Sequence, residues 1–143
     1  DVAARGWHEF REIETAVVHR VTQFTEWQLI DCGGGVVVDL DSEGQEIFSA
    51  SKVEALRKDS VVLYLQRDVG FLEQKIRGDQ NRPDLSEEKS FSQIMQRRDP
   101  WYREAAHDVI DARDLRKHQI AGAVLEKYYA ATGILPPGHP DAN

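Results

Sequence analysis

The chain has 143 residues, of which 41% are hydrophobic and 30% are charged, and its formal net charge is −7. These values are typical of a globular protein, and the negative charge disfavours nucleic acid as a partner. A membrane helix needs about 20 apolar residues in succession, and because no run approaches this length we expect no membrane partner. The single Cys32 excludes an intramolecular disulfide and favours a reducing, cytoplasmic compartment.

The first predicted element is a helix over residues 8–21. Its apolar side chains recur at helical spacing and form one stripe, made of Phe10, Ile13, Val17 and Val21. Arg11 and Glu14 are three residues apart and share a face beside this stripe. A carboxylate at that spacing can hold a guanidinium in one orientation for a ligand. An ordinary surface ion pair has the same spacing and is the more common case.

A short strand is predicted over residues 27–32, and three glycines follow it directly at 33–35. Consecutive glycines contribute no packing and lose backbone entropy, so they indicate a tight turn or a ligand that approaches the backbone. A turn alone is the more common reason, although glycine N–H groups can also face an oxygen-rich ligand. We interpret Cys32 as a small buried side chain, because no histidine has a spacing that suggests an activated nucleophile.

The middle of the chain predicts a helix, a strand and a second helix. Ser51 and Glu54 form a capping-box pattern that opens a helix over residues 51–58. The continuous apolar run 60–65 is typical of a strand buried on both faces in a parallel sheet. Asp68 can cap the helix that follows it, and Gly78 can end that helix.

A polar loop over residues 78–89 comes next and is long enough to form a lid. Its Arg82 is either a solvated loop residue or a cation that folds over a phosphate and neutralises developing charge. A helix then runs from Ser90 towards His107, and Pro100 is expected to bend it. Of the adjacent arginines 97 and 98, one can cover the helix surface while the other reaches a carboxylate.

The last predicted elements are a strand over residues 107–112 and a helix over 115–132 that Gly133 ends. Alternation of strands and helices predicts an α/β fold with a mostly parallel sheet flanked by helices. Ligands of such sheets bind beyond the carboxyl ends of the strands, which is where the glycines are placed. We expect one domain over residues 1–131 and an irregular tail over 132–143.

Taken in order, several segments resemble the shikimate kinase family; they are GWHEFREIE, GGGVV, VVLYL, NRP, RRDPWYREAA and VID. The resemblance extends from Gly6 to Asp111. It implies a three-layer P-loop kinase fold of the nucleoside-monophosphate-kinase type. It also implies ATP-dependent phosphorylation of the shikimate 3-hydroxyl in the chorismate route to aromatic amino acids, with ATP and Mg²⁺ as cofactors.

The resemblance implies roles for individual residues at the substrate. Arg11 would bind the shikimate carboxylate, with Arg98 as a second carboxylate-binding residue, and Glu14 would orient the arginines. Gly34 and Gly35 would contact shikimate hydroxyls. The glycines would thus allow a polyhydroxylated ring to lie against the backbone.

On the nucleotide side, the resemblance makes Arg82 the lid arginine at the transferred phosphate and places Arg77 beside the adenine. The family's first strand and its G-x-x-x-x-G-K-[ST] loop, which hold the phosphates and Mg²⁺, have no counterpart among the 143 residues. No metal ligand is therefore assigned in this chain. Cys32 and Asp84 also depart from the family pattern, as does the long segment 39–50 after the glycines.

Two explanations fit the missing loop. In the first, the chain is the C-terminal portion of a working shikimate kinase, and a separate N-terminal segment carries the loop. In the second, it is a catalytically inactive binding or regulatory module for an aromatic or alicyclic acid. A weaker third possibility is a sensor domain within a transcriptional regulator. In each case the chain alone is predicted to have little or no kinase activity.

Overall fold

The computed structural model describes residues 2–77 and 90–142. The chain divides into two compact units, residues 1–62 and residues 63–143. The first unit holds two helices and an antiparallel hairpin, and the second holds three helices and two parallel strands. None of the described helices is both long and apolar enough to cross a membrane.

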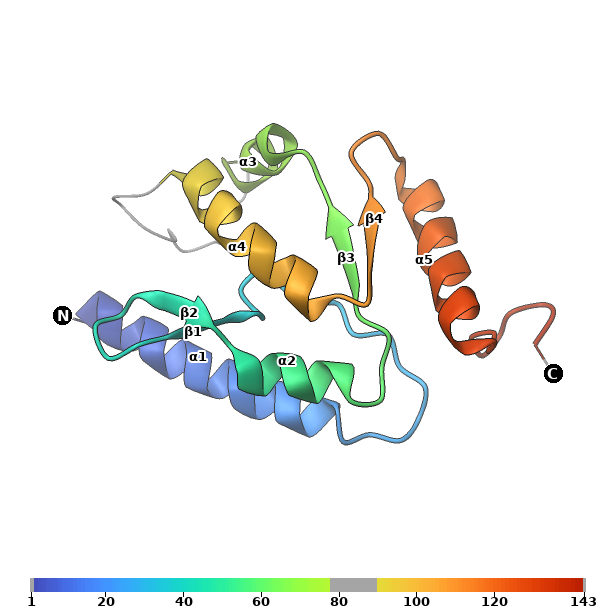
Figure 1. Ribbon diagram of the computed structural model, residues 1–143, viewed down its shortest axis with the longest axis horizontal. Coiled ribbons are helices and arrows are strands. Elements are labelled where there is room, and N and C mark those ends of the chain that lie inside the picture. Colours follow the sequence, from blue (N-terminus) through green and yellow to red (C-terminus); the bar gives the residue numbers. More distant parts are fainter. Residues whose placement is uncertain (1, 78–89, 143) are drawn as a thin grey trace. The chain divides into compact units, whose positions relative to one another are not determined.

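In the first unit, helix α1 (Val2–Val21) packs against helix α2 (Ala50–Arg57) and strand β1 (Val38–Leu40). Strand β1 pairs antiparallel with β2 (Glu46–Phe48), and Figure 1 shows this hairpin beside α1. The buried apolar side chains come from α1, α2, β1 and the turn before β1, and none comes from β2. They are Val18, Val37, Val38, Val53 and Leu56. The predicted helix 8–21 is thus confirmed and extends further towards the N-terminus.

The strand predicted over residues 27–32 is wrong, because this segment forms no strand among the described residues. The strands of the first unit come after the glycines: β1 begins at Val38, and its other residues and all of β2 lie in the segment 39–50 that departs from the family pattern. The Asp41 side chain accepts hydrogen bonds from the backbone N–H groups of Glu43 and Gln45, each at 2.9 Å, and Gly44 has φ +81°. This turn closes a local hairpin, whereas residues 27–32 pair with no strand in the described part of this unit.

The N-cap of α2 lies two residues before the predicted position. Ser49, not Ser51, is the N-cap, and its hydroxyl accepts a hydrogen bond from the backbone N–H of Lys52 at 3.4 Å. Ser49 follows β2 closely, and its own N–H donates to the carbonyl of Val37 at 2.8 Å. This backbone bond places Ser49 at the start of the helix, and Ser51 instead lies 2.8 Å from His19 Nε2.

The apolar stripe of α1 does not form the core of the first unit. Phe10, Ile13 and Val17 are 49%, 64% and 52% exposed, whereas Arg11 and Val18 on the opposite part of the helix are buried. The helical period was therefore correct, but the face that packs against α2 and β1 carries a charged residue.

In the second unit, strand β3 (Leu63–Gln66) pairs in parallel with β4 (Asp108–Asp111), with Leu63 opposite Asp108 and Gln66 opposite Asp111. Helices α3 (Val69–Arg77) and α4 (Phe91–Ala105) contact each other, and α5 (Lys117–Thr132) lies beside β4 (Figure 1). The parallel pair confirms the predicted α/β class in part. The predicted burial of strand 60–65 on both faces is wrong at Leu65, which is 42% exposed.

The helix ends of the second unit follow the sequence signals. Asp68 Oδ1 accepts the N–H of Phe71 at 2.9 Å, and Gly133 ends α5 with φ +69°. Ser90 and Gln93 form a capping box at the start of α4, and Pro100 lies inside that helix. The predicted loop 78–89, with Gly78 and Arg82, lies outside the described residues.

Candidate functional site

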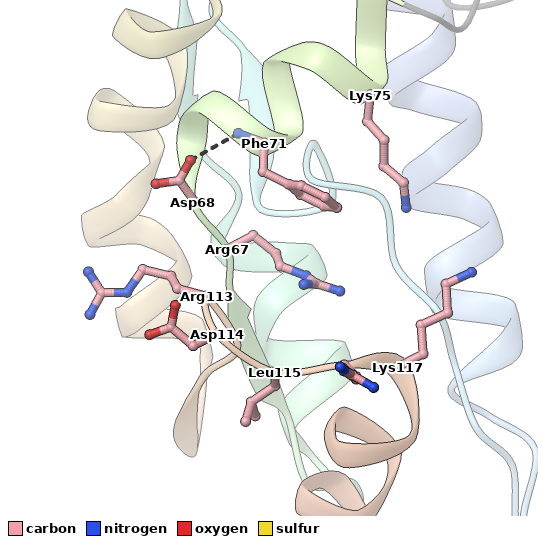
Figure 2. A pocket seen from close by; sticks show the side chains of 9 residues that line it. Arg67, Asp68, Phe71, Lys75, Arg113, Asp114, Leu115 and Lys117 are labelled. Carbon is pink, nitrogen blue, oxygen red and sulfur yellow. Dashed lines mark hydrogen bonds between the residues drawn. The ribbon is translucent and has the colours of Figure 1, made fainter.

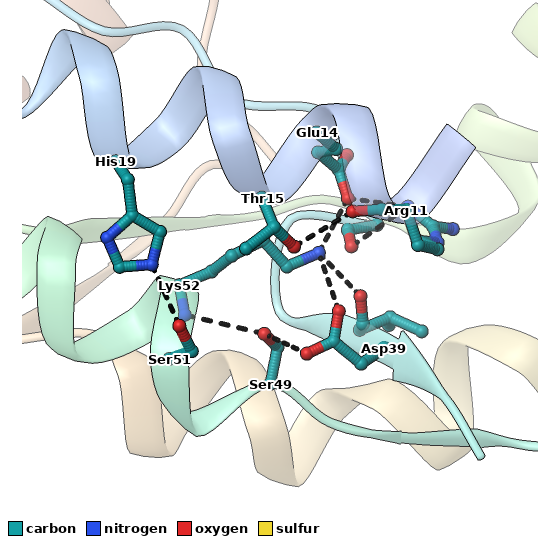
Figure 3. Close-up of polar contacts among 10 residues, drawn as sticks. Arg11, Glu14, Thr15, His19, Asp39, Ser49, Ser51 and Lys52 are labelled. Atoms are coloured by element: carbon teal, nitrogen blue, oxygen red, sulfur yellow. Dashed lines mark hydrogen bonds and ion pairs between the residues drawn. The ribbon is translucent and has the colours of Figure 1, made fainter. Parts of the chain in front are cut away.

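Arg11 is a buried arginine held in one orientation. It is 6% exposed, and its Nη1 donates to Glu14 Oε1 at 2.9 Å and to the carbonyl of Gly35 at 3.1 Å (Figure 3). Its guanidinium also lies 5.2 Å from the ring centre of Phe10. The Nε atom is buried and makes no hydrogen bond within the described part of the chain. A fixed guanidinium with an unused buried donor is suited to an anionic ligand, for which a carboxylate has the matching geometry.

The structure shows why one of the three consecutive glycines, Gly35, has no side chain. A Cβ atom at this position would lie 2.6 Å from Arg11 Nη2 and 2.9 Å from Arg11 Cζ, so any side chain would displace the guanidinium. Gly33 differs, because a Cβ there would meet nothing within 4 Å. Residues 33–37 form a turn closed by the bond from the N–H of Val36 to the carbonyl of Gly33 at 3.1 Å. The sequence favoured a tight turn and left a ligand at this backbone as the less common reason; the structure shows the turn and also places the Arg11 guanidinium beside Gly35.

Lys52 is a functional candidate that sequence reasoning missed. Its side chain is fully buried, and Nζ lies 2.6 Å from Glu14 Oε1, 2.6 Å from the carbonyl of Val38 and 3.5 Å from Asp39 Oδ1. A signal was present in the helical period, because Lys52 shares a face of α2 with the buried Leu56, four residues further on. A lysine at an apolar position predicts a buried charge that needs partners.

These side chains form a balanced group that we call the buried ion cluster; its members are Arg11, Glu14, Asp39 and Lys52. Two cations and two anions give it a formal charge of zero. Ser49 is also fully buried, and its hydroxyl donates to Asp39 Oδ2 at 2.6 Å. Each charge has a partner, which is the condition under which ionised groups tolerate burial.

Cys32 is not the buried residue that the sequence suggested, because its side chain is exposed. Although the residue remains exposed to solvent, neighbouring groups partly desolvate its sulfur and raise the pKa of the thiol, and the carboxylates of Asp31 and Glu14 raise this pKa further. Little thiolate therefore forms near neutral pH, which makes Cys32 a poor nucleophile.

A second candidate site lies in the second unit, beyond the carboxyl ends of β3 and β4. It is a pocket of about 390 Å³ lined by five basic and two acidic side chains, with Phe71 and Leu115 between them (Figure 2). Arg67 and Lys75 lie 5.2 and 5.6 Å from the ring centre of Phe71. Arg67 Nη1 also donates to the carbonyl of Ala112 at 3.3 Å, which joins the ends of the two strands. We call this the basic pocket; its lining residues are Arg67, Asp68, Phe71, Lys75, Arg113, Asp114, Leu115, Arg116 and Lys117.

The basic pocket has an excess of positive charge, so it is suited to a phosphate-bearing ligand. One edge carries an exposed ion pair, in which Arg113 Nη2 lies 2.7 Å from Asp111 Oδ2. The hydrogen bonds from Arg113 hold the pKa of Asp111 at about 2. Sequence reasoning named the carboxyl ends of parallel strands as the place for a ligand but did not name these residues.

The other predicted site residues lie in different places. Gly34 is in the turn with Gly35, and Arg98 is a buried residue of α4 with 2% exposure. Arg77 is the last residue of α3, and neither its side chain nor Arg82 belongs to the described part. Among the described residues, no group of three or more His, Cys, Asp or Glu side chains is placed to hold a metal ion, so we assign no magnesium site to them.

The fold and the two sites define an α/β protein with a buried arginine suited to a carboxylate and a basic pocket beyond its parallel strands. A sequence model described as shikimate kinase matches residues 2–129. The chain belongs to the shikimate kinase family, which confirms the resemblance found in the sequence motifs.

Curated relatives agree with this assignment. A shikimate kinase of Leptospira biflexa is 38% identical over 125 residues, which are 87% of this chain and 68% of that protein. A shikimate kinase of Leptospira borgpetersenii is 31% identical over 121 residues, or 85% of this chain and 67% of the relative. One of Dehalococcoides mccartyi is 27% identical over 133 residues, or 90% and 69%. The chain thus spans about two thirds of the length of these relatives. No solved structure matches.

Proposed function

We propose that this chain is the larger part of a shikimate kinase, which transfers the γ-phosphate of ATP to the 3-hydroxyl of shikimate in the route to chorismate and the aromatic amino acids. Family membership and the names of the relatives support this activity. The structural observation that carries the proposal is the buried Arg11, which Glu14 holds in place while its Nε donor remains unused. The proposed fold is the three-layer P-loop kinase fold.

At the substrate, Arg11 binds the shikimate carboxylate through its unused donor. Glu14 fixes the guanidinium, so little orientational freedom is lost when the carboxylate arrives. We retain Arg98 as a second carboxylate-binding residue, and Gly34 and Gly35 as contacts to shikimate hydroxyls, on the basis of the family motifs.

At the nucleotide, the basic pocket attracts the phosphates of ATP. Arg67, Lys75 and Lys117 supply positive charge there, and Phe71 offers an apolar surface between two cations. We retain Arg82 as the residue that neutralises charge on the transferred phosphate and Arg77 as a residue at the adenine. Magnesium, when bound with ATP, neutralises charge on the phosphates. This chain contributes chiefly by positioning and charge neutralisation.

The 143 residues contain no G-x-x-x-x-G-K-[ST] segment, so we further propose that a separate segment with this motif completes the kinase. The exposed stripe of Phe10, Ile13 and Val17 on α1 supports this proposal, because an apolar helix face of this kind gains stability when it is covered. Without that segment we expect little or no phosphoryl transfer. The missing motif favours, as a second candidate, a catalytically inactive module that binds an alicyclic acid.

Calorimetric titration of the chain with shikimate and with shikimate methyl ester tests the carboxylate site. We expect shikimate to bind and the ester, which has no negative charge, to bind at least about tenfold more weakly. Equal binding of both compounds, or of neither, would contradict the proposed role of Arg11. Phosphorylation of shikimate, measured with and without an added P-loop segment, then separates the kinase from the inactive module.

A further inference from the structure

We propose that Lys52 is a positioning residue for the carboxylate-binding Arg11, an inference that rests on the proposed function of that arginine. Lys52 comes from α2 and Arg11 from α1, and the same oxygen of Glu14 joins them. Glu14 Oε1 lies 2.6 Å from Lys52 Nζ and 2.9 Å from Arg11 Nη1 (Figure 3). A carboxylate oxygen held by two cations from different elements has one favoured position, which in turn fixes the guanidinium.

The position of Lys52 is itself determined by the fold. Its ammonium group donates to the carbonyl of Val38 at 2.6 Å, and this backbone belongs to the hairpin strand that follows the glycine turn. Asp39 Oδ1 lies at 3.5 Å on the same strand. Lys52 therefore links α1, α2 and β1 at the point where Arg11 rests on Gly35.

Lys52 also sets the charge that a ligand meets. With Lys52 present, the buried ion cluster has a formal charge of zero, and Glu14 shares its negative charge between two cations. Without the ammonium group the cluster has a formal charge of −1, and Glu14 opposes an incoming carboxylate beside Arg11. In a buried site such a like charge acts strongly, because the local dielectric is low. Loss of Lys52 should therefore weaken binding of an anion more than binding of its neutral ester.

The test compares three variants with the unmodified chain. Lys52→Met removes the ammonium group and keeps an unbranched side chain. Lys52→Met combined with Asp39→Asn removes one cation and one anion together, so the cluster stays neutral. This double variant keeps the test possible if the single variant does not fold. Val53→Ala is the matched control, because Val53 is a buried neighbour on α2 outside the ion cluster.

The first measurement needs no ligand. Nitrogen NMR of the Arg11 guanidinium, assigned by its loss in Arg11→Lys, reports whether rotation of the Nη groups is restricted. We expect restricted rotation in the unmodified chain and in Val53→Ala, and free rotation in both variants that lack Lys52. Restricted rotation in either of those two variants would overturn the positioning role, since a merely structural lysine would affect stability alone.

The second measurement is the affinity for shikimate and for its methyl ester. We expect Lys52→Met to weaken shikimate binding about tenfold or more and to change ester binding less than about twofold. An equal loss for both compounds would overturn the proposal. If the unmodified chain binds neither compound while the NMR signals change as expected, then the proposed function fails and the positioning of Arg11 by Lys52 stands.

Discussion

The two units use charge in different ways. In the first unit, Arg11 and Lys52 are buried. Glu14 holds both of them: it lies on the same helix as Arg11 and on a different helix from Lys52. In the second unit, basic side chains line an open pocket, and its ion pair between Asp111 and Arg113 is about half exposed at both side chains. Buried charges act through exact placement, whereas exposed charges are screened and act through their sum. The first unit therefore suits recognition of one group, and the second suits attraction of a highly charged ligand.

The largest expected effect is at the buried cation. Arg11→Ala should weaken shikimate binding by about 2–5 kcal/mol, because it removes one partner of a desolvated charge pair. Calorimetric titration measures this loss, and Arg20→Ala, on the exposed C-terminal part of the same helix, is the control. An unchanged affinity in Arg11→Ala would remove Arg11 from the site.

A single methyl group at Gly35 should disturb the same arginine. The new Cβ of Gly35→Ala would lie 2.6 Å from Arg11 Nη2, so the guanidinium must move. We expect the free energy of unfolding to fall by about 1–3 kcal/mol, as for other overpacked sites, and shikimate binding to weaken with it. Denaturant unfolding and titration measure both. Gly33→Ala is a matched control that should change neither, since its Cβ would meet open space.

A single exposed charge in the basic pocket should matter less. Lys117→Gln should weaken ATP binding by about 0.5–1 kcal/mol, the range of exposed charge interactions, and added salt should reduce the difference between the two proteins. Titration with ATP at low and high salt measures this. Lys127→Gln on the same helix, outside the pocket lining, should leave ATP binding unchanged. An equal loss in both variants would argue against a role for the pocket.

The smallest expected effect concerns pH in the second unit. Burial raises the pKa of Tyr64, and the hydrogen bond from its hydroxyl to Asp99 Oδ1 at 2.9 Å raises it further. The folded state therefore keeps this proton more strongly than the unfolded chain does. The resulting stability is fully present below the ordinary tyrosine pKa of 10.0 and is lost as the pH rises above it.

Tyr64→Phe should remove that alkaline dependence. Thermal unfolding followed between neutral and strongly alkaline pH should show a smaller decline in the variant than in the unmodified chain. Tyr129→Phe, at an exposed position of α5, is the control and should keep the full decline. A decline that is the same in all three proteins would show that Tyr64 does not contribute to it.

Much of the local structure followed from neighbouring residues in the sequence. Three helix ends are set by interactions with residues at most four positions away: Asp68 and Ser90 begin helices, and Gly133 ends one. Such signals do not depend on the rest of the fold. The parallel pair β3–β4 followed from two β-rich runs separated by helical segments. The spacing of Arg11 and Glu14, with the order of the motifs, was enough to indicate the family.

Only the tertiary structure decided which of these residues form a site. The bond from Arg11 to Gly35 spans 24 positions and that from Lys52 to Glu14 spans 38, so neither follows from local preference. Three features depend on which helix faces meet: the burial of Lys52, the close contact of Gly35 with the Arg11 guanidinium, and the exposure of the apolar stripe of α1. Helical periodicity shows that residues share a face, but the packing of distant segments determines whether that face meets protein or solvent.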